Sequence, residues 1–261
     1  MIKILTGYSD KGGSTTAFIN LTNYLNSIGV NCVLYGPNTW HLDKCKSDLS
    51  NNIIYNVDDV VLLHYINLDK RLDVKKVIYV CHEKWWFNFS KINNIWDIGV
   101  FLHEEHIKFH KEFSGEYVII PNLKETLTPK EKPELDLVAG IIGTIEERKQ
   151  THISIQRALK DKCTKILLYG NVGNENYFHK NVQPLLSNNR IELMGYVEDK
   201  QKIYDSIGRV YHSSKGEVAC LVKDECYLTN TKFFGNDETN NIVSRLTNQE
   251  IISLWLKLFE L

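Results

Sequence analysis

The sequence of 261 residues predicts an α/β protein with two parallel-sheet domains. Three observations predict this fold. Short apolar runs alternate with amphipathic stretches along the chain, these runs lack the alternating polarity of half-exposed strands, and a proline-containing stretch divides the chain near its middle. Strands that are apolar on both faces are typical of parallel sheets covered by helices on both sides.

Eleven strands are expected from the apolar runs. They are residues 2–5, 32–35, 60–63, 77–81, 100–102, 117–120, 137–142, 166–169, 191–194, 210–212 and 232–234. The clearest helix follows the first strand: Gly12 and Gly13 precede it, Ser14 is its expected N-cap, and Gly29 ends it. Strand, glycine turn, helix and next strand together form a right-handed βαβ unit.

The domain boundary is expected at residues 121–134, which hold three of the five prolines and show no apolar periodicity. The expected domains are an N-terminal domain at 1–125 and a C-terminal domain at 135–245. A helix at 246–261 could return to the N-terminal domain.

The composition excludes several classes of protein. The 31 basic side chains nearly balance 32 acidic ones, which argues against a surface devoted to nucleic acid or anionic lipid. No apolar run is long enough to span a membrane and the start lacks the pattern of a signal peptide, so a soluble, cytoplasmic protein is expected. The six cysteines include no C-x-x-C pair, so neither a zinc site nor a disulfide framework is indicated.

Candidate ligand-binding segments follow the expected strands. The segment TGYSDKGGS, residues 6–14, joins the first strand to the first helix, where the adjacent Gly12 and Gly13 permit close approach of a ligand. It matches neither the Walker loop nor GxGxxG, and a plain turn into a helix explains it equally well.

A second segment, VIYVCHEKWWF, places His82 at the end of a strand and Trp85 and Trp86 just beyond it. A polar ring beside two aromatic faces suits a sugar, which stacks on aromatic side chains. The alternative is a histidine that is satisfied within the core beside packed aromatics. His64 ends the run VVLLH in a similar way.

A third segment, LVAGIIGTIEERKQ, opens the C-terminal half. Gly140 and Gly143 permit close backbone approach, and Arg148 and Lys149 can reach phosphate oxygens from the start of the next helix. Two solvated surface cations are the alternative.

The fourth segment, EVACLVKDE, places Glu217 and Glu225 on one expected helix. They would lie about 12 Å apart along its axis and about 80° apart around it. With so many acidic residues in the chain, such a pair also arises by chance.

Together these segments resemble the retaining nucleotide-sugar glycosyltransferases of GT-B fold, and the resemblance covers nearly the whole chain. The donor-half motifs of that family correspond to AGIIGTIEERK, KILLYGNVG, IELMGYVED and EVACLVKDE, in the family's order. The acceptor-half motifs correspond to the GG-containing loop, DDVVLLH, VCHEKWW and IIPNLKETLTP. The resemblance implies two Rossmann-like domains that face a cleft.

The resemblance also implies roles for individual residues. Lys149, helped by Arg148, would contact the donor pyrophosphate, Glu217 would face the donor sugar, and Glu225 would bind the ribose hydroxyls. The donor-side strand ends include Gly143 and Gly170, and the backbone around Tyr196 would hold the base. On the acceptor side Gly12 and Gly13 would approach the sugar or phosphate, and His82 would lie beside the reacting centre.

The resemblance implies a retaining, metal-independent hexosyltransferase that uses a nucleoside diphosphate sugar, UDP-sugar above all, and no cofactor. The acceptor, a glycan, lipid, protein or modified DNA, and the oligomeric state stay open. Thr144 stands where the family has arginine, and CYLTNTKFFG replaces a glycine-containing turn near Glu225. These departures leave room for a degenerate nucleotide- or sugar-binding protein, and a sugar-nucleotide epimerase or hydrolase is a second alternative. A dinucleotide-dependent oxidoreductase is disfavoured because GxGxxG is absent.

Overall fold

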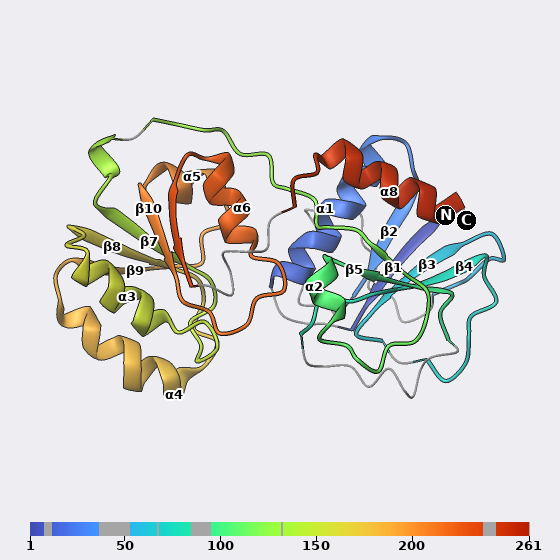
Figure 1. Cartoon of the computed structure of the whole chain (residues 1–261), viewed down its shortest axis with the longest axis horizontal. Coiled ribbons are helices and arrows are strands. Elements are labelled where there is room, and N and C mark those ends of the chain that lie inside the picture. The colour runs from blue at the N-terminus through green and yellow to red at the C-terminus, as the bar shows by residue number, and fades with distance from the viewer. Residues whose placement is uncertain are drawn as a thin grey trace. The chain divides into compact units, whose positions relative to one another are not determined.

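The computed structural model describes residues 1–7, 12–36, 53–66, 68–84, 95–131, 133–236 and 244–260 (Figure 1). Contacts divide the chain into two compact units. The first unit comprises Met1–Leu123 together with Ser244–Leu261, and the second comprises Lys124–Val243.

The first unit is built on a parallel sheet with strand order β2-β1-β3-β4-β5-β6. Its strands are β1 (Ile2–Thr6), β2 (Cys32–Tyr35), β3 (Val60–His64), β4 (Lys76–Val80), β5 (Ile98–Phe101) and β6 (Tyr117–Ile119). The central strands β1, β3 and β4 are buried along their whole length, which explains why their sequences are apolar without alternation.

Two helices distant in sequence cover the same face of this sheet. These are α1 (Gly13–Ser27) and α8 (Asn248–Glu260), and both contribute side chains to one core cluster with β1, β3 and β4. Lys75 and Lys76, at the start of β4, donate hydrogen bonds to the carbonyl oxygens of Phe259 at 3.2 Å and Leu258 at 2.9 Å. These bonds satisfy carbonyls at the end of α8 that have no partner within the helix.

Helix α1 begins two residues earlier than the sequence predicts. Gly12 is the N-cap, with extended backbone, and Ser14 lies inside the first turn, so the prediction that Ser14 caps the helix is wrong. Gly29 follows the helix with φ 84°, a conformation that glycine adopts without strain, and it ends the helix as expected.

The second unit has a parallel sheet with strand order β11-β10-β7-β8-β9. Its strands are β7 (Val138–Ile142), β8 (Lys165–Tyr169), β9 (Ile191–Gly195), β10 (Arg209–His212) and β11 (Lys232–Gly235). All eleven strands expected from the sequence are therefore present, with ends that differ by one or two residues.

Helices cover both faces of the second sheet (Figure 1). One core cluster joins the sheet to α3 (Thr151–Lys160), α4 (Glu175–Tyr177) and the π-helical turn Phe178–Val182. The opposite cluster joins it to α5 (Lys200–Asp205) and α6 (Leu221–Leu228).

In the first unit the short helix α2 (Glu104–Ile107) follows β5. Both sheets are thus α/β layers, as the sequence predicts.

Candidate functional site

The carboxyl edge of the second sheet carries a row of glycines. Strands β7, β8 and β9 end in or before Gly143, Gly170 and Gly195, whose φ angles are 135°, 143° and 71°. The Gly143 N–H donates to the Tyr169 carbonyl and the Gly170 N–H donates to the Gly195 carbonyl, each at 2.8 Å. A Cβ at Gly170 would lie 2.1 Å from the Gly143 oxygen, so the two backbones approach closely only because position 170 has no side chain.

Gly140 has a different role from the one that its sequence position suggests. It lies inside β7 rather than after it, and a Cβ there would meet the Ile207 side chain at 2.5 Å. The prediction that Gly140 admits a ligand is wrong, because its missing side chain makes room for a core residue. Around Gly143, by contrast, an added Cβ would meet only the Lys149 side chain, at 3.8 Å.

A buried carboxylate lies among cations at this edge. The ammonium group of Lys149 donates to Glu217 Oε1, and the same oxygen lies 3.3 Å from His212 Nε2 and 3.6 Å from Arg148 Nη1. Burial alone raises the pKa of Glu217, but Lys149 and His212 outweigh it and hold this pKa well below its ordinary value. Glu217 is therefore ionised and held in place by its neighbours.

Arg148 and Lys149 are not equivalent. Arg148 is 43% exposed, and it donates to the Gly216 carbonyl at 3.0 Å and pairs with Glu146 at 2.7 Å. Lys149 is only 19% exposed and points to Glu217. Lys149 is the better placed of the two cations for an anion at the glycine row.

Glu217 does not lie on the helix that carries Glu225. Helix α6 begins at Leu221, after a non-helical segment in which Glu217 is tied to Lys149 and to His212 at the end of β10. The prediction of a single helix with both glutamates, and the separation calculated from it, is wrong. The physical reason is that ion pairs to neighbouring loops fix Glu217 before the helix starts.

Glu225 is 4% exposed, and both of its carboxylate oxygens accept hydrogen bonds. Lys200 Nζ donates to Oε1 at 2.6 Å, and the Tyr204 hydroxyl donates to Oε2 at 2.7 Å. Lys200 also donates to Glu125 at 2.8 Å. Burial tends to lower the pKa of Lys200, but Glu225 and Glu125 raise it above its usual value, so the ammonium stays charged.

Sequence reasoning missed Lys200, Tyr204 and His212. Lys200 and Tyr204 belong to α5, which packs beside α6 in the folded unit. No spacing in the sequence therefore connects them to Glu225. His212 ends β10, a position that could have been noticed because it is a polar residue at a strand end. Tyr196, which follows β9, is 50% exposed.

In the first unit, His82 lies two residues beyond β4. Its ring stacks on Phe18 of α1 with centroids 5.0 Å apart and planes 13° from parallel, and it lies 5.4 Å from the His64 ring. Burial, with smaller contributions from His64 and His106, lowers the pKa of His82 well below its ordinary value. The imidazole is therefore neutral and can both donate and accept a hydrogen bond.

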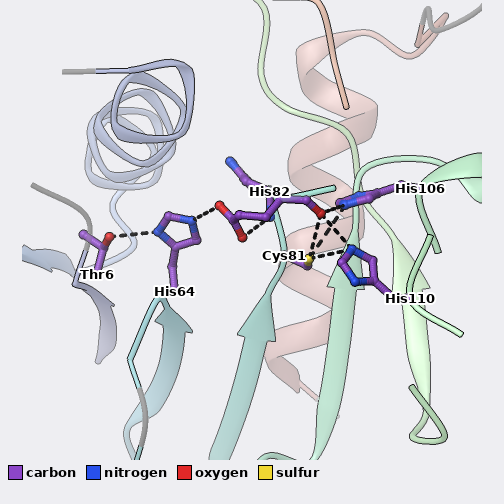
Figure 2. A network of polar contacts seen from close by, with 7 residues as sticks. Thr6, His64, Cys81, His82, His106 and His110 are labelled. Carbon is purple, nitrogen blue, oxygen red and sulfur yellow. Dashed lines mark hydrogen bonds and ion pairs between the residues drawn. The ribbon is translucent and has the colours of Figure 1, made fainter. Parts of the chain in front are cut away.

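A hydrogen-bonded chain supports the His82 segment (Figure 2). Thr6 Oγ1 lies 2.8 Å from His64 Nδ1, and His64 Nε2 lies 2.8 Å from Glu83 Oε1. The other oxygen of that carboxylate accepts from the His82 backbone N–H at 3.1 Å. His64, which is fully buried, thus orients the residue next to His82.

The glycine loop of the first unit is described only in part. Gly12 caps α1, and its carbonyl accepts from the Thr16 N–H at 3.1 Å and the Thr16 hydroxyl at 3.2 Å, while Gly13 is the first helical residue. Residues 8–11 of the loop, and Trp85 and Trp86, lie outside the described residues.

Solved structures match the whole chain. Anabaena HepE in complex with UDP-glucose aligns with a TM-score of 0.70 at 12% identity, over 99% of this chain and 89% of that chain. WaaG, a glycosyltransferase involved in lipopolysaccharide biosynthesis, aligns with a TM-score of 0.63 at 10% identity, over 100% of this chain and 91% of that chain. The chain has the GT-B fold. The fold class expected from the sequence is therefore confirmed.

A third solved structure aligns over less of its own length. A mutant of TarM from S. aureus, in complex with Fondaparinux, alpha-GlcNAc-glycerol and UDP, aligns with a TM-score of 0.59 at 13% identity, over 78% of this chain and 55% of that chain. No protein-family model and no curated protein matches the sequence. Among the described residues of this GT-B chain, no helix is long and apolar enough to cross a membrane.

Proposed function

We propose that this GT-B chain is a retaining glycosyltransferase that moves a hexose from a nucleoside diphosphate sugar, UDP-sugar above all, to an acceptor hydroxyl. The observation that carries the proposal is the Lys149–Glu217 pair beside the glycine row of the second unit. The similarity in fold to HepE, whose structures hold UDP-glucose and UDP, supports the choice of donor.

In this proposal Lys149 binds the diphosphate of the donor. The Lys149 side-chain carbons lie beside Gly143, and the ammonium exchanges part of its contact with Glu217 for phosphate oxygens. Negative charge develops on the diphosphate as the glycosidic bond breaks, and a fixed cation lowers that barrier. Arg148 adds a weaker contribution because it is more exposed.

Glu217 and Glu225 bind the sugar and the ribose of the donor, respectively. Glu217, ionised and held at the end of β10, accepts hydrogen bonds from sugar hydroxyls. Glu225 accepts from the ribose hydroxyls: each of its oxygens already accepts one bond, from Lys200 or Tyr204, and a carboxylate oxygen has a second lone pair. Gly170 and the backbone around Tyr196 lie at the neighbouring strand ends and are assigned to the nucleotide.

His82 is assigned to the chemistry, and the Gly12–Gly13 turn to sugar or phosphate contact. A neutral imidazole suits a hydrogen bond to a sugar hydroxyl that strengthens in the transition state. Lys149 and Arg148 supply the positive charge that a diphosphate needs, so we propose that transfer requires no divalent metal at the donor.

The test is a calorimetric titration of the folded protein with uridine, guanosine and adenosine diphosphates, with a chelator present, followed by assays with UDP-hexoses. Binding of UDP and slow release of hexose, or its transfer to an added acceptor, are expected. Absence of binding by every nucleotide contradicts the proposal, and loss of binding with chelator contradicts metal independence.

A catalytically degenerate binding protein is the second candidate. Thr144 stands at the position of an expected arginine, and the Glu225 carboxylate already pairs with Lys200. It would bind UDP-hexose without consuming it. An epimerase or hydrolase would instead yield an isomer or free sugar with no dependence on an acceptor.

A further inference from the structure

The first unit contains a buried cluster of one cysteine and two histidines, Cys81, His106 and His110 (Figure 2). Their exposed fractions are 0%, 0% and 6%. Cys81 directly follows β4, His106 belongs to α2, and His110 lies just beyond the end of α2. One ligand atom from each residue falls within 4.8 Å of the other two.

The separations within the cluster are those of a metal site. Cys81 Sγ lies 3.7 Å from His106 Nε2 and 3.4 Å from His110 Nε2. Around a tetrahedral zinc ion, with Zn–S about 2.3 Å and Zn–N about 2.0 to 2.1 Å, sulfur and nitrogen ligands lie about 3.6 Å apart. Both sulfur–nitrogen separations therefore match those around a zinc ion.

The donor set also suits zinc. A thiolate and imidazoles are the ligands of structural zinc sites, and the H-x3-H spacing of His106 and His110 is one that such sites use. No pair of cysteines marks this cluster in the sequence, because a single cysteine and the two histidines come together only in the fold.

We propose that Cys81, His106 and His110 bind one zinc ion, with the Glu83 carbonyl or a water molecule as fourth ligand. The Glu83 oxygen lies 2.8 Å from His106 Nε2 and 2.7 Å from His110 Nε2, so it faces the same point as the side chains.

Metal binding rearranges protons in a definite way. Without metal, the Leu102 N–H donates to His106 Nδ1 at 3.3 Å, so Nε2 carries the ring proton and donates to Glu83. On binding, the ring proton of each histidine moves from Nε2 to Nδ1, and at His106 the Nδ1 atom gives up the long bond from Leu102. The Cys81 thiol loses its proton to solvent, and the imidazoles coordinate as neutral ligands through Nε2.

The zinc ion would be structural, and it would act on the segment that carries His82. Glu83 offers its carbonyl to the cluster, while its carboxylate contacts His64 and the His82 N–H. Metal at Cys81 and the two histidines would thus fix the position of His82. The cluster belongs to the first unit and the proposed nucleotide site to the second, so the two proposals fail independently.

The experiment is cobalt loading of the full-length, metal-stripped protein, followed by absorption and X-ray absorption spectroscopy. One equivalent of Co²⁺ is expected to give thiolate-to-cobalt charge transfer and intense tetrahedral bands, with one sulfur in its first shell. Zinc is expected to displace it and to raise the thermal midpoint. No stoichiometric binding by the folded wild type, or a first shell without sulfur, overturns the proposal.

Variants locate the site. Cys81→Ser is expected to abolish the charge-transfer band, and His110→Gln to weaken cobalt affinity at least tenfold. Cys32→Ala removes another buried thiol of the first unit, and His179→Gln removes an exposed histidine of the second unit; both should bind as wild type. Should Cys81→Ser keep the band, or should Cys32→Ala lose it, the assignment is wrong. The wild-type first shell decides the question even where a variant does not fold.

Discussion

The two units present different chemistry at the carboxyl ends of their sheets. The second unit combines bare glycine backbone with charged pairs, Lys149 with Glu217 and Lys200 with Glu225. The first unit gathers imidazoles, His64, His82 and others, in surroundings where burial lowers the pKa of His82 and favours its neutral form. Under the proposed function, the charged pairs would contact the donor diphosphate, and the neutral imidazole of His82 would contact a reacting hydroxyl. The following predictions test that division.

The largest effect is expected from removing the cations of the second unit. The double variant Arg148→Ala and Lys149→Ala should weaken UDP binding by about 3 kcal/mol or more, because each charge-assisted contact to phosphate contributes roughly 1.5 to 3 kcal/mol. Calorimetry measures the affinity, and circular dichroism checks the fold. Lys165→Ala, which removes an exposed cation of β8 paired with Glu192, is the control and should bind as wild type. Equal affinity in the double variant would remove both cations from the site.

A smaller effect of another kind is expected in the first unit. His82→Ala should lower turnover about 100-fold, since a hydrogen bond made in the transition state is lost, while UDP affinity stays within twofold. Donor hydrolysis serves as readout if no acceptor is known. A purely structural histidine would instead lower the thermal midpoint, with activity following the folded fraction. Wild-type rates in folded His82→Ala protein would mean that the imidazole takes no part in the reaction.

Glu225→Gln sharpens the comparison within the second unit. The glutamine amide has the shape of the carboxylate but lacks the negative charge that Lys200 and the ribose hydroxyls contact. Nucleotide affinity should therefore fall about tenfold, which corresponds to about 1.4 kcal/mol. Turnover at saturating donor should change little. Glu192→Gln, on exposed β9, is the matched control. A loss of stability with unchanged affinity would identify Glu225 as a structural residue of the α5–α6 contact.

The smallest effect concerns Asp224 on α6. Burial, with a contribution from Glu225, raises the pKa of Asp224 from 3.8 to about 6, although Lys124 and Lys223 oppose the shift. The folded state thus binds this proton more tightly than the unfolded chain, so stability falls as pH rises from about 4 to about 6. Asp224→Asn should flatten that slope and stabilise the protein by about 1 kcal/mol at pH 8, after allowance for partial exposure.

Urea unfolding at pH 5 and pH 8 measures this difference. The exposed Asp58→Asn serves as control and should leave the slope as in wild type. A steeper loss of stability above pH 6 in Asp224→Asn would contradict the sign of the prediction.

The sequence predicted the strands well because buried parallel strands are apolar along their length, as in β1, β3 and β4. Positions that depend on tertiary contacts could not be predicted. The missing side chain of Gly140 makes room for Ile207. Glu217 lies outside the expected helix, where its carboxylate pairs with Lys149. Cys81 lies near His106 and His110 only because the fold packs the segments after β4 and around α2 together. No local sequence pattern predicts this contact.

Helix α8 belongs to the first unit, although the ribosome synthesises it after the second unit. Ile251, Trp255 and Phe259 pack with Ile4 and Phe18, so the first unit lacks part of its interior until residues beyond 250 have left the ribosome. The second unit, Lys124–Val243, needs no such late partner for its two core clusters. During synthesis, the unit encoded second is therefore the one able to complete its folding first.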